Sequence, residues 1–216
     1  MRHERECYRS GLKYILGIDE VGRGPLAGPV VAGAVCLPIH DEQLSQKLKG
    51  VRDSKDMTAL QREALITTIK ETAIAWGIGV ASVEEIDKFN ILEATKLAME
   101  RAVRDSMVRF PDFRPDVLFL DSVLLPKLVT QYPQVSIVEG DKRTLSIAAA
   151  SIIAKVWRDA YMLDLHEELP HYGFDENKGY GTAQHLEAIQ QFGPSPQHRR
   201  SFEPLKSLLS DDENGI

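Results

Sequence analysis

Residues 17–35 read GIDEVGRGPLAGPVVAGAV, where two adjacent acids and a glycine-rich turn separate two apolar segments. The first segment is YILGID at residues 14–19, which ends in an acid. The second is PVVAGAVCL at residues 29–37, which is rich in small and β-branched side chains. Both segments are therefore predicted to form buried strands.

Further apolar runs predict three more strands, over residues 74–83, 117–120 and 135–138. The run at 117–120 again ends in an acid, Asp121, and the run at 135–138 comes shortly before Asp141. An apolar run closed by an acid thus occurs three times in the chain.

Helical segments lie between and after these strands. Thr58 is the expected N-cap of a helix over residues 59–73, and residues 91–108 repeat apolar positions at helical spacing. The longest helix is predicted over residues 144–169, followed by shorter ones over 183–192 and 204–209. This order predicts a mixed α/β domain over residues 1–170 and a helical C-terminal extension over residues 171–216.

The composition is that of an ordinary globular protein, because 43% of the 216 residues are hydrophobic and 27% are charged. No apolar run is long enough to cross a membrane, and the N-terminal MRHERECYRS lacks a signal-peptide core. A cytoplasmic protein without a membrane partner is therefore expected. Cys7 and Cys36 fit no zinc-spaced pattern and are expected to be reduced. Without coiled-coil heptads, a monomer is expected.

The formal net charge of −6 argues against a general polyanion binder, because phosphate contacts need positive charge. A nucleic-acid site must then be a local basic patch. Scattered basic side chains either follow a phosphate track or form a solvated face. Tyr180 either stacks on a sugar or base or closes a turn. The basic candidates are Arg23, Lys55, Lys142, Arg143, Lys155, Arg158, Lys178, His198, Arg199 and Arg200, with residues 198–200 the densest group.

Acids at the ends of buried strands predict a metal site. Burying an ionised carboxylate without a partner is unfavourable, so Asp19, Glu20 and Asp121 indicate a nearby cation. Alternation points Asp19 and Glu20 to opposite sides, and a bend at residues 21–22 is needed before both reach one ion. Asp141 is either a fourth carboxylate or a helix cap. Oxygen ligands suit Mg²⁺ or Mn²⁺, although strand-end acids can also be ordinary loop residues.

The glycines after the first strand imitate a dinucleotide-binding fingerprint. That fingerprint requires a helix to open among the glycines, whereas Pro25 and Pro29 lead into another strand. Gly22, Gly24 and Gly28 instead allow backbone amides to approach a sugar or phosphate directly.

Taken together, these motifs resemble ribonuclease HII. The resemblance runs through nearly the whole chain, and the order and spacing of its motifs agree with the family. One departure is Asn177, which stands where many relatives carry histidine. The matching segments are residues 17–35, RDSK at 52–55, FLDS at 119–122, GDKRTLSIAAASIIAKVWRD at 140–159, NKGYGT at 177–182 and FGPSPQHRRSF at 192–202.

The resemblance implies an α/β fold in which a ribonuclease H-like mixed β-sheet is flanked by helices and followed by a C-terminal helical region. It also implies an active site with two divalent ions, Mn²⁺ or Mg²⁺. Carried over by motif, Asp19, Glu20 and Asp121 resemble metal ligands, and Asp141 resembles the fourth catalytic carboxylate.

For the substrate, the resemblance implies that the backbone of Gly22, Arg23 and Gly24 senses the ribose 2′-hydroxyl, the group that distinguishes RNA from DNA. Tyr180 would pack against the deoxyribose at an RNA–DNA junction. Lys55 of RDSK is a further substrate-binding candidate.

The implied reaction is hydrolysis of the RNA strand of RNA–DNA hybrids and incision 5′ of single ribonucleotides in duplex DNA. It leaves 3′-hydroxyl and 5′-phosphate ends, without a covalent protein intermediate. Two other hypotheses are a metal-dependent nuclease for structured DNA and a non-catalytic nucleic-acid binder whose acids only cap turns.

Overall fold

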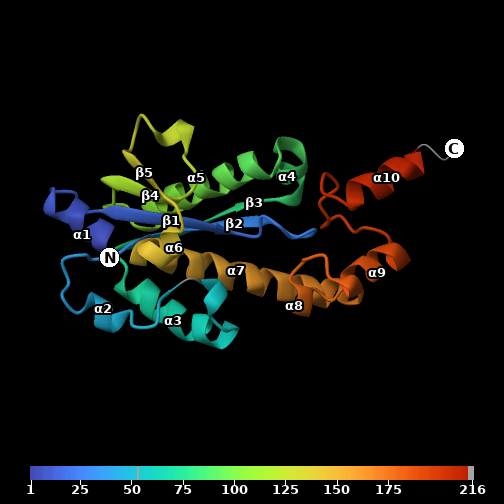
Figure 1. The fold of residues 1–216 in the computed structure, drawn as a ribbon, viewed down its shortest axis with the longest axis horizontal. Coiled ribbons are helices and arrows are strands. Elements are labelled where there is room, and N and C mark those ends of the chain that lie inside the picture. Colours follow the sequence, from blue (N-terminus) through green and yellow to red (C-terminus); the bar gives the residue numbers. More distant parts are fainter. Residues whose placement is uncertain (53, 214–216) are drawn as a thin grey trace.

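Five strands form one mixed sheet in the spatial order β3-β2-β1-β4-β5 (Figure 1). The protein is described by a computed structural model that covers residues 1–52 and 54–213. β1, β2 and β3 pair antiparallel, whereas β1, β4 and β5 run parallel. All five predicted strands are confirmed. Their bounds are β1 (Ile15–Val21), β2 (Val30–Cys36), β3 (Ala75–Ala81), β4 (Val117–Asp121) and β5 (Gln134–Ile137).

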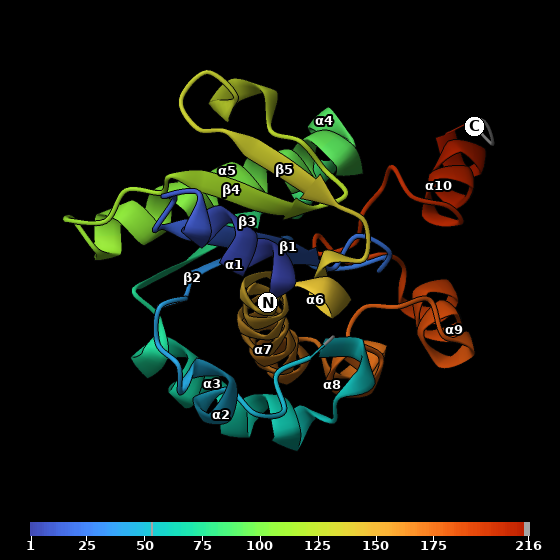
Figure 2. The same ribbon diagram turned by 60° about the vertical axis from the view of Figure 1, so that its left-hand side comes forward.

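Helices cover both faces of this sheet, as Figures 1 and 2 show. One face carries α4 (Val83–Phe89) and α5 (Ile91–Arg109), and the other carries α2 (Leu44–Lys47), α3 (Ala59–Thr72) and α7 (Leu145–Glu168). The predicted mixed sheet between helical layers is thus confirmed.

Side chains of β1 alternate between the two layers. Leu16 and Ile18 belong to the apolar cluster that contains residues of α5, whereas Ile15 belongs to the cluster that contains residues of α7. α7 crosses β1 so closely that a Cβ atom at Gly17 would overlap the backbone of Ser146. The face of β1 that carries odd-numbered residues therefore lies directly against α7.

Among the helices that were not predicted from the sequence, two have seven or eight residues. α1 (Arg2–Arg9) places the buried Glu4 at the start of α7, where its Oε1 accepts the backbone N–H groups of Leu145 (2.6 Å) and Ser146 (3.2 Å). α4 begins with a reciprocal capping box between Ser82 and Glu85, which directly follows β3. The remaining short elements are α6 (Gly140–Arg143), α8 (Phe174–Asn177) and the 3₁₀ turns η1 (Ser54–Asp56), η2 (Pro126–Leu128) and η3 (Pro170–Tyr172).

The C-terminal segment returns to the loop after β1. It contains α9 (Ala183–Phe192) and α10 (Leu205–Glu213), and Ala27 forms an isolated antiparallel bridge with His198. A third apolar cluster joins Leu26 and Met162 to this segment. The division of the chain at residue 170 stays a prediction. Within the described residues, no helix is long and apolar enough to span a membrane.

Candidate active site

Parallel pairing of β1 with β4 brings two of the predicted acids side by side. The register aligns Ile18 with Leu120, so Asp19 and Asp121 lie at the same level on neighbouring strands. Asp19 is buried on the α7 side of the sheet, where the hydroxyl of Ser151 hydrogen-bonds to its carboxylate.

Glu20 follows Asp19 on the same strand and so points to the opposite side. β1 stays paired through Val21, and the left-handed conformation, with φ of 90°, occurs at Gly22. The bend thus occurs at Gly22, within the predicted residues 21–22. Glu20 Oε1 accepts a hydrogen bond from Arg23 Nη1 (3.2 Å), whereas its Oε2 is buried without a hydrogen-bond partner among the described residues.

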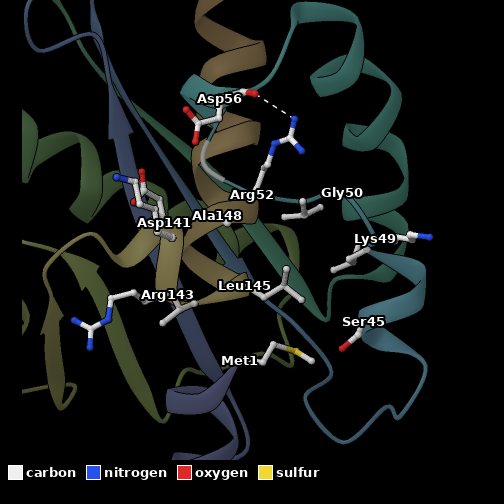
Figure 3. Close-up of a pocket in the computed structure, with 14 residues that line it drawn as sticks. Met1, Ser45, Lys49, Gly50, Arg52, Asp56, Asp141, Arg143, Leu145 and Ala148 are labelled. Carbon is white, nitrogen blue, oxygen red and sulfur yellow. Dashed lines mark hydrogen bonds between the residues drawn. The ribbon is translucent and has the colours of Figure 1, made fainter.

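Asp141 is held near this area through its neighbour in the chain. The N–H of Gly140 donates to Asp121 Oδ1 at 3.3 Å. Asp141 itself is buried and lines a cavity of about 510 Å³ together with Arg52 and Arg143 (Figure 3). It thus lies beside the end of β4, but in a different cavity from the one that Glu20 lines.

Burial and neighbouring carboxylates at the ends of β1 and β4 disfavour the ionised forms of Asp19 and Glu20. Burial raises the pKa of Asp19 to about 8, and the negative charges of Glu20 and Asp121 add to this effect. Burial also raises the pKa of Glu20, which the positive charge of Arg23 opposes. A divalent cation among these carboxylates would favour their ionised forms.

The donor chemistry fits a hard divalent cation. Asp19, Glu20 and Asp121 offer oxygen atoms alone, and the unpartnered Oε2 of Glu20 is available as a ligand. Across residues 1–52 and 54–213, however, no group of three His, Cys, Asp or Glu side chains is arranged to hold a metal ion.

A cleft of about 550 Å³ at the end of β1 brings the predicted substrate-binding residues together. Its wall contains Gly22, Arg23, Gly24, Lys55 and Tyr180, which come from three separate segments of the chain, beside Glu20. The segment that carries Lys55 is attached to α7 by a hydrogen bond of 2.8 Å between the hydroxyls of Ser54 and Ser151. Every predicted substrate contact therefore lines one cleft next to a predicted metal ligand.

Three of the predicted basic candidates are buried, so neither a phosphate track nor a solvated face describes them. Arg158, His198 and Arg199 expose at most 1% of their surface. The two arginines donate to backbone carbonyl groups, and His198 bonds to His185 and Ser195. Of the basic group at residues 198–200, only Arg200 is exposed and so able to follow a phosphate track or join a solvated face.

A buried pair of histidines holds the backbone of Tyr180. The N–H of Ser195 donates to His198 Nδ1 (3.0 Å), so the Nε2 of neutral His198 carries the proton and donates to His185 Nε2 (3.0 Å). His185 Nδ1 then donates to the carbonyl of Tyr180 (2.8 Å). This chain of bonds requires both rings to be neutral. Burial lowers the pKa of His185, and burial together with the charge of His185 lowers that of His198 to about 4.

Asn177, the residue that departs from the family motif, bridges the same loop. Its Nδ2 donates to the carbonyl of Tyr172, and its Oδ1 accepts the N–H of Gly179, each at 2.7 Å. The amide therefore supports the loop that presents Tyr180. Neither this role nor that of the histidine pair was recognised from the sequence, where the only signal was the match to NKGYGT and HRRSF.

Comparison with known proteins identifies the family. The model of the family described as Ribonuclease HII matches residues 16–204. Ribonuclease HII of Geobacillus sp. (strain WCH70) is 49% identical over 214 residues, which are 99% of this chain and 73% of that protein. Ribonuclease HII of Chlamydia caviae is 47% identical over 207 residues, 95% of this chain and 92% of that protein.

The fold gives the same result. The crystal structure of ribonuclease H2 from Pyrococcus horikoshii OT3 superimposes with a TM-score of 0.74 at 25% identity, covering 94% of this chain and all of that one. The chain therefore belongs to the ribonuclease HII family and is a metal-dependent endoribonuclease that hydrolyses the RNA strand of RNA–DNA hybrids.

Proposed function

We propose that the enzyme also incises duplex DNA on the 5′ side of single embedded ribonucleotides, by two-metal-ion catalysis that leaves 3′-hydroxyl and 5′-phosphate ends. The observation that carries this proposal is the cleft at the end of β1. There the Gly22–Gly24 backbone, Lys55 and Tyr180 line one wall with Glu20. The proposed ribose-reading loop and one of the proposed metal ligands, Glu20, thus line the same cleft.

Asp19, Glu20, Asp121 and Asp141 are the proposed ligands of Mg²⁺ or Mn²⁺. When bound, two such ions activate a water molecule for in-line attack and stabilise the leaving oxygen. Two features support this assignment: Asp19 lies beside Asp121 on the neighbouring strand, and Glu20 Oε2 has no hydrogen-bond partner among the described residues. Arg23, which pairs with Glu20 at 3.2 Å, balances part of the negative charge before an ion enters.

The proposed substrate contacts lie on the two sides of an RNA–DNA junction. The backbone of Gly22, Arg23 and Gly24 would meet the ribose 2′-hydroxyl, and Tyr180, which is 47% exposed, would pack against the deoxyribose that follows. Because a sugar ring has an apolar face, an exposed aromatic ring suits this contact without reading the base.

The phosphate backbone would follow two local basic regions despite the net charge of −6. Lys55 and Lys155 line the cleft. Lys49, Arg52 and Arg143 line the separate cavity that contains Asp141 (Figure 3). Such side chains position a duplex without reading its sequence.

The test is to incubate the purified protein with labelled duplexes that differ at one position. One carries a single ribonucleotide in DNA, one is all DNA, and one is an RNA–DNA hybrid, each with and without Mg²⁺ or Mn²⁺. We expect metal-dependent cutting of the hybrid, incision on the 5′ side of the single ribonucleotide, and an intact all-DNA duplex. Cutting of the hybrid without incision at the single ribonucleotide would refute the proposal. Sedimentation of the protein with and without duplex tests the expected monomer.

A further inference from the structure

Arg199 lies beneath the Gly22–Gly24 loop and binds its carbonyl groups. Its Nη2 donates to the carbonyl of Gly22 (2.5 Å), its Nη1 donates to that of Arg23 (2.9 Å), and Nε and Nη2 both donate to that of Gly28 (3.0 and 2.8 Å). All three nitrogen atoms of the guanidinium thus donate hydrogen bonds to the loop over residues 22–28.

These contacts fix the direction of the opposite side of each peptide. In a trans peptide the C=O and the N–H point in opposite directions. Since the carbonyls of Gly22 and Arg23 turn inward to Arg199, the N–H groups of Arg23 and Gly24 turn outward. Both residues line the cleft, and neither N–H has an acceptor among the described residues.

The burial of Arg199 is not explained by an ion pair with a carboxylate. Arg199 is fully buried, and the described part of the chain supplies it with no ion pair. Burial and the nearby charge of Arg158 lower its pKa to about 9, so the group is still charged at neutral pH. Burying a cation without an ion pair is unfavourable. The carbonyl groups of Gly22, Arg23 and Gly28 offset this cost, and they can do so only because their loop folds around the guanidinium.

Arg158 of α7 connects this loop to the one that carries Tyr180. Its Nη2 donates to the carbonyl of Ala27, and its Nη1 donates to that of Lys178, each at 3.0 Å. Gly22 lies against the same side chain, because a Cβ atom there would overlap Arg158 Nε. The two arginines therefore form one buried layer under both substrate loops.

We propose that Arg199 is a positioning residue for substrate selection: by holding the carbonyls of Gly22 and Arg23, it directs the N–H groups of Arg23 and Gly24 toward the 2′-hydroxyl of a bound ribonucleotide. The inference rests on the proposed function, since it names what sets the geometry of the loop that reads the ribose. A lysine cannot replace Arg199, because one ammonium group cannot reach three carbonyls in the fixed fork of a guanidinium.

The test compares Arg199→Lys with Arg101→Lys. Arg101, on α5, also donates to a backbone carbonyl, that of Val80, and lies on the opposite face of the sheet from α7. For each protein we would measure kcat and KM on the duplex with one ribonucleotide, Ki of the all-DNA duplex as a competitive inhibitor, and Tm. The ratio of Ki to KM reports selection of the ribonucleotide, independently of general affinity for DNA.

We expect Arg199→Lys to lower the ratio of Ki to KM by about 5-fold for each N–H bond to the ribose that it misdirects, while Ki stays within about 2-fold of its original value. Arg101→Lys should lower Tm and leave the ratio unchanged. If folded Arg199→Lys keeps the original ratio, Arg199 does not position the loop. A wild-type enzyme that does not incise the duplex with one ribonucleotide would instead refute the proposed function.

A second measurement covers the case in which Arg199→Lys does not fold. In the ¹⁵N-labelled wild-type protein in EDTA, the amide signals of Arg23 and Gly24 should shift when the duplex with one ribonucleotide is added. They should shift much less with the all-DNA duplex. Equal shifts with both duplexes would overturn the inference.

Discussion

Acidification should destabilise the protein through the histidine pair under Tyr180. His198 and His185 share a hydrogen bond of 3.0 Å between their Nε2 atoms, which exists only while one of these nitrogens lacks a proton. Protonation of His185 at Nε2 removes the acceptor of this bond, and protonation of His198 at Nδ1 removes the acceptor of the Ser195 N–H; either event leaves a buried cation. The surroundings offer aromatic rings, those of Tyr172 and Phe174, and no described carboxylate pairs with either histidine.

The size and sign of the effect follow from the pKa of His198. Folding lowers it from 6.5 to about 4, which corresponds to about 3 kcal/mol between the folded and unfolded states. Because the unfolded chain binds the proton more readily, this stability is complete above pH 6.5 and is lost as the pH falls from 6.5 to 4. Asp19 acts in the opposite direction, since its raised pKa favours the folded state as the pH falls from 8 to 4.

The assay is therefore a comparison between two proteins. Urea unfolding of the wild type and of His198→Gln is followed from pH 4.5 to 7.5, and the difference in unfolding free energy is plotted against pH. Asp19 contributes equally to both proteins and cancels. We expect the advantage of the wild type to shrink by 2 to 3 kcal/mol toward pH 4.5. Parallel profiles over the whole range would show that the pair is not neutral in the folded protein.

Three further predictions concern single side chains. Asp121→Asn should lower kcat more than about 100-fold, because it removes a proposed metal ligand. Its Tm should stay equal or rise, because the substitution removes a charge that repels Asp19. Asp112→Asn, at an exposed position, is the control, and full activity of Asp121→Asn would exclude a metal ligand at residue 121. Gly22→Ala should destabilise the protein by more than about 2 kcal/mol in urea unfolding, since its φ of 90° and the contact with Arg158 leave no space for Cβ; a smaller loss would mean that the loop relaxes easily. Glu4→Gln should lower the unfolding free energy by about 1 kcal/mol, because a neutral amide binds the N-terminal N–H groups of α7 less strongly; an unchanged value would show that α1 is not anchored there.

The strands and their acids could be predicted because local sequence determines them. An apolar run that ends in an acid was sufficient to find β1 and β4, and their parallel pairing then placed Asp19 beside Asp121. α4 was missed because the apolar run at 74–83 extends into its first turn. Its signal, the capping box of Ser82 and Glu85, was present in the sequence.

Other features depend on contacts that a linear sequence does not display. Arg199 binds a carbonyl group 171 residues away, and nothing in its local sequence distinguishes it from an exposed arginine. Glu4 caps a helix that begins 141 residues later. The bend at Gly22 was predicted at residues 21–22 from the glycine after the two acids, whereas the cleft in which Glu20 meets Lys55 and Tyr180 depends on distant contacts.

The bond between Arg199 and Gly28 also has a consequence for how the enzyme is made. The two residues are separated by 171 positions, so at ribosomal rates of about 5–20 residues per second the loop waits roughly 10–30 s for the arginine that orders it. During that interval a nascent chain can already carry Asp19 and Asp121 on paired strands. It still lacks the side chain that orients the Gly22–Gly24 loop, so the proposed selection of a ribonucleotide can arise only after residue 199 has been synthesised.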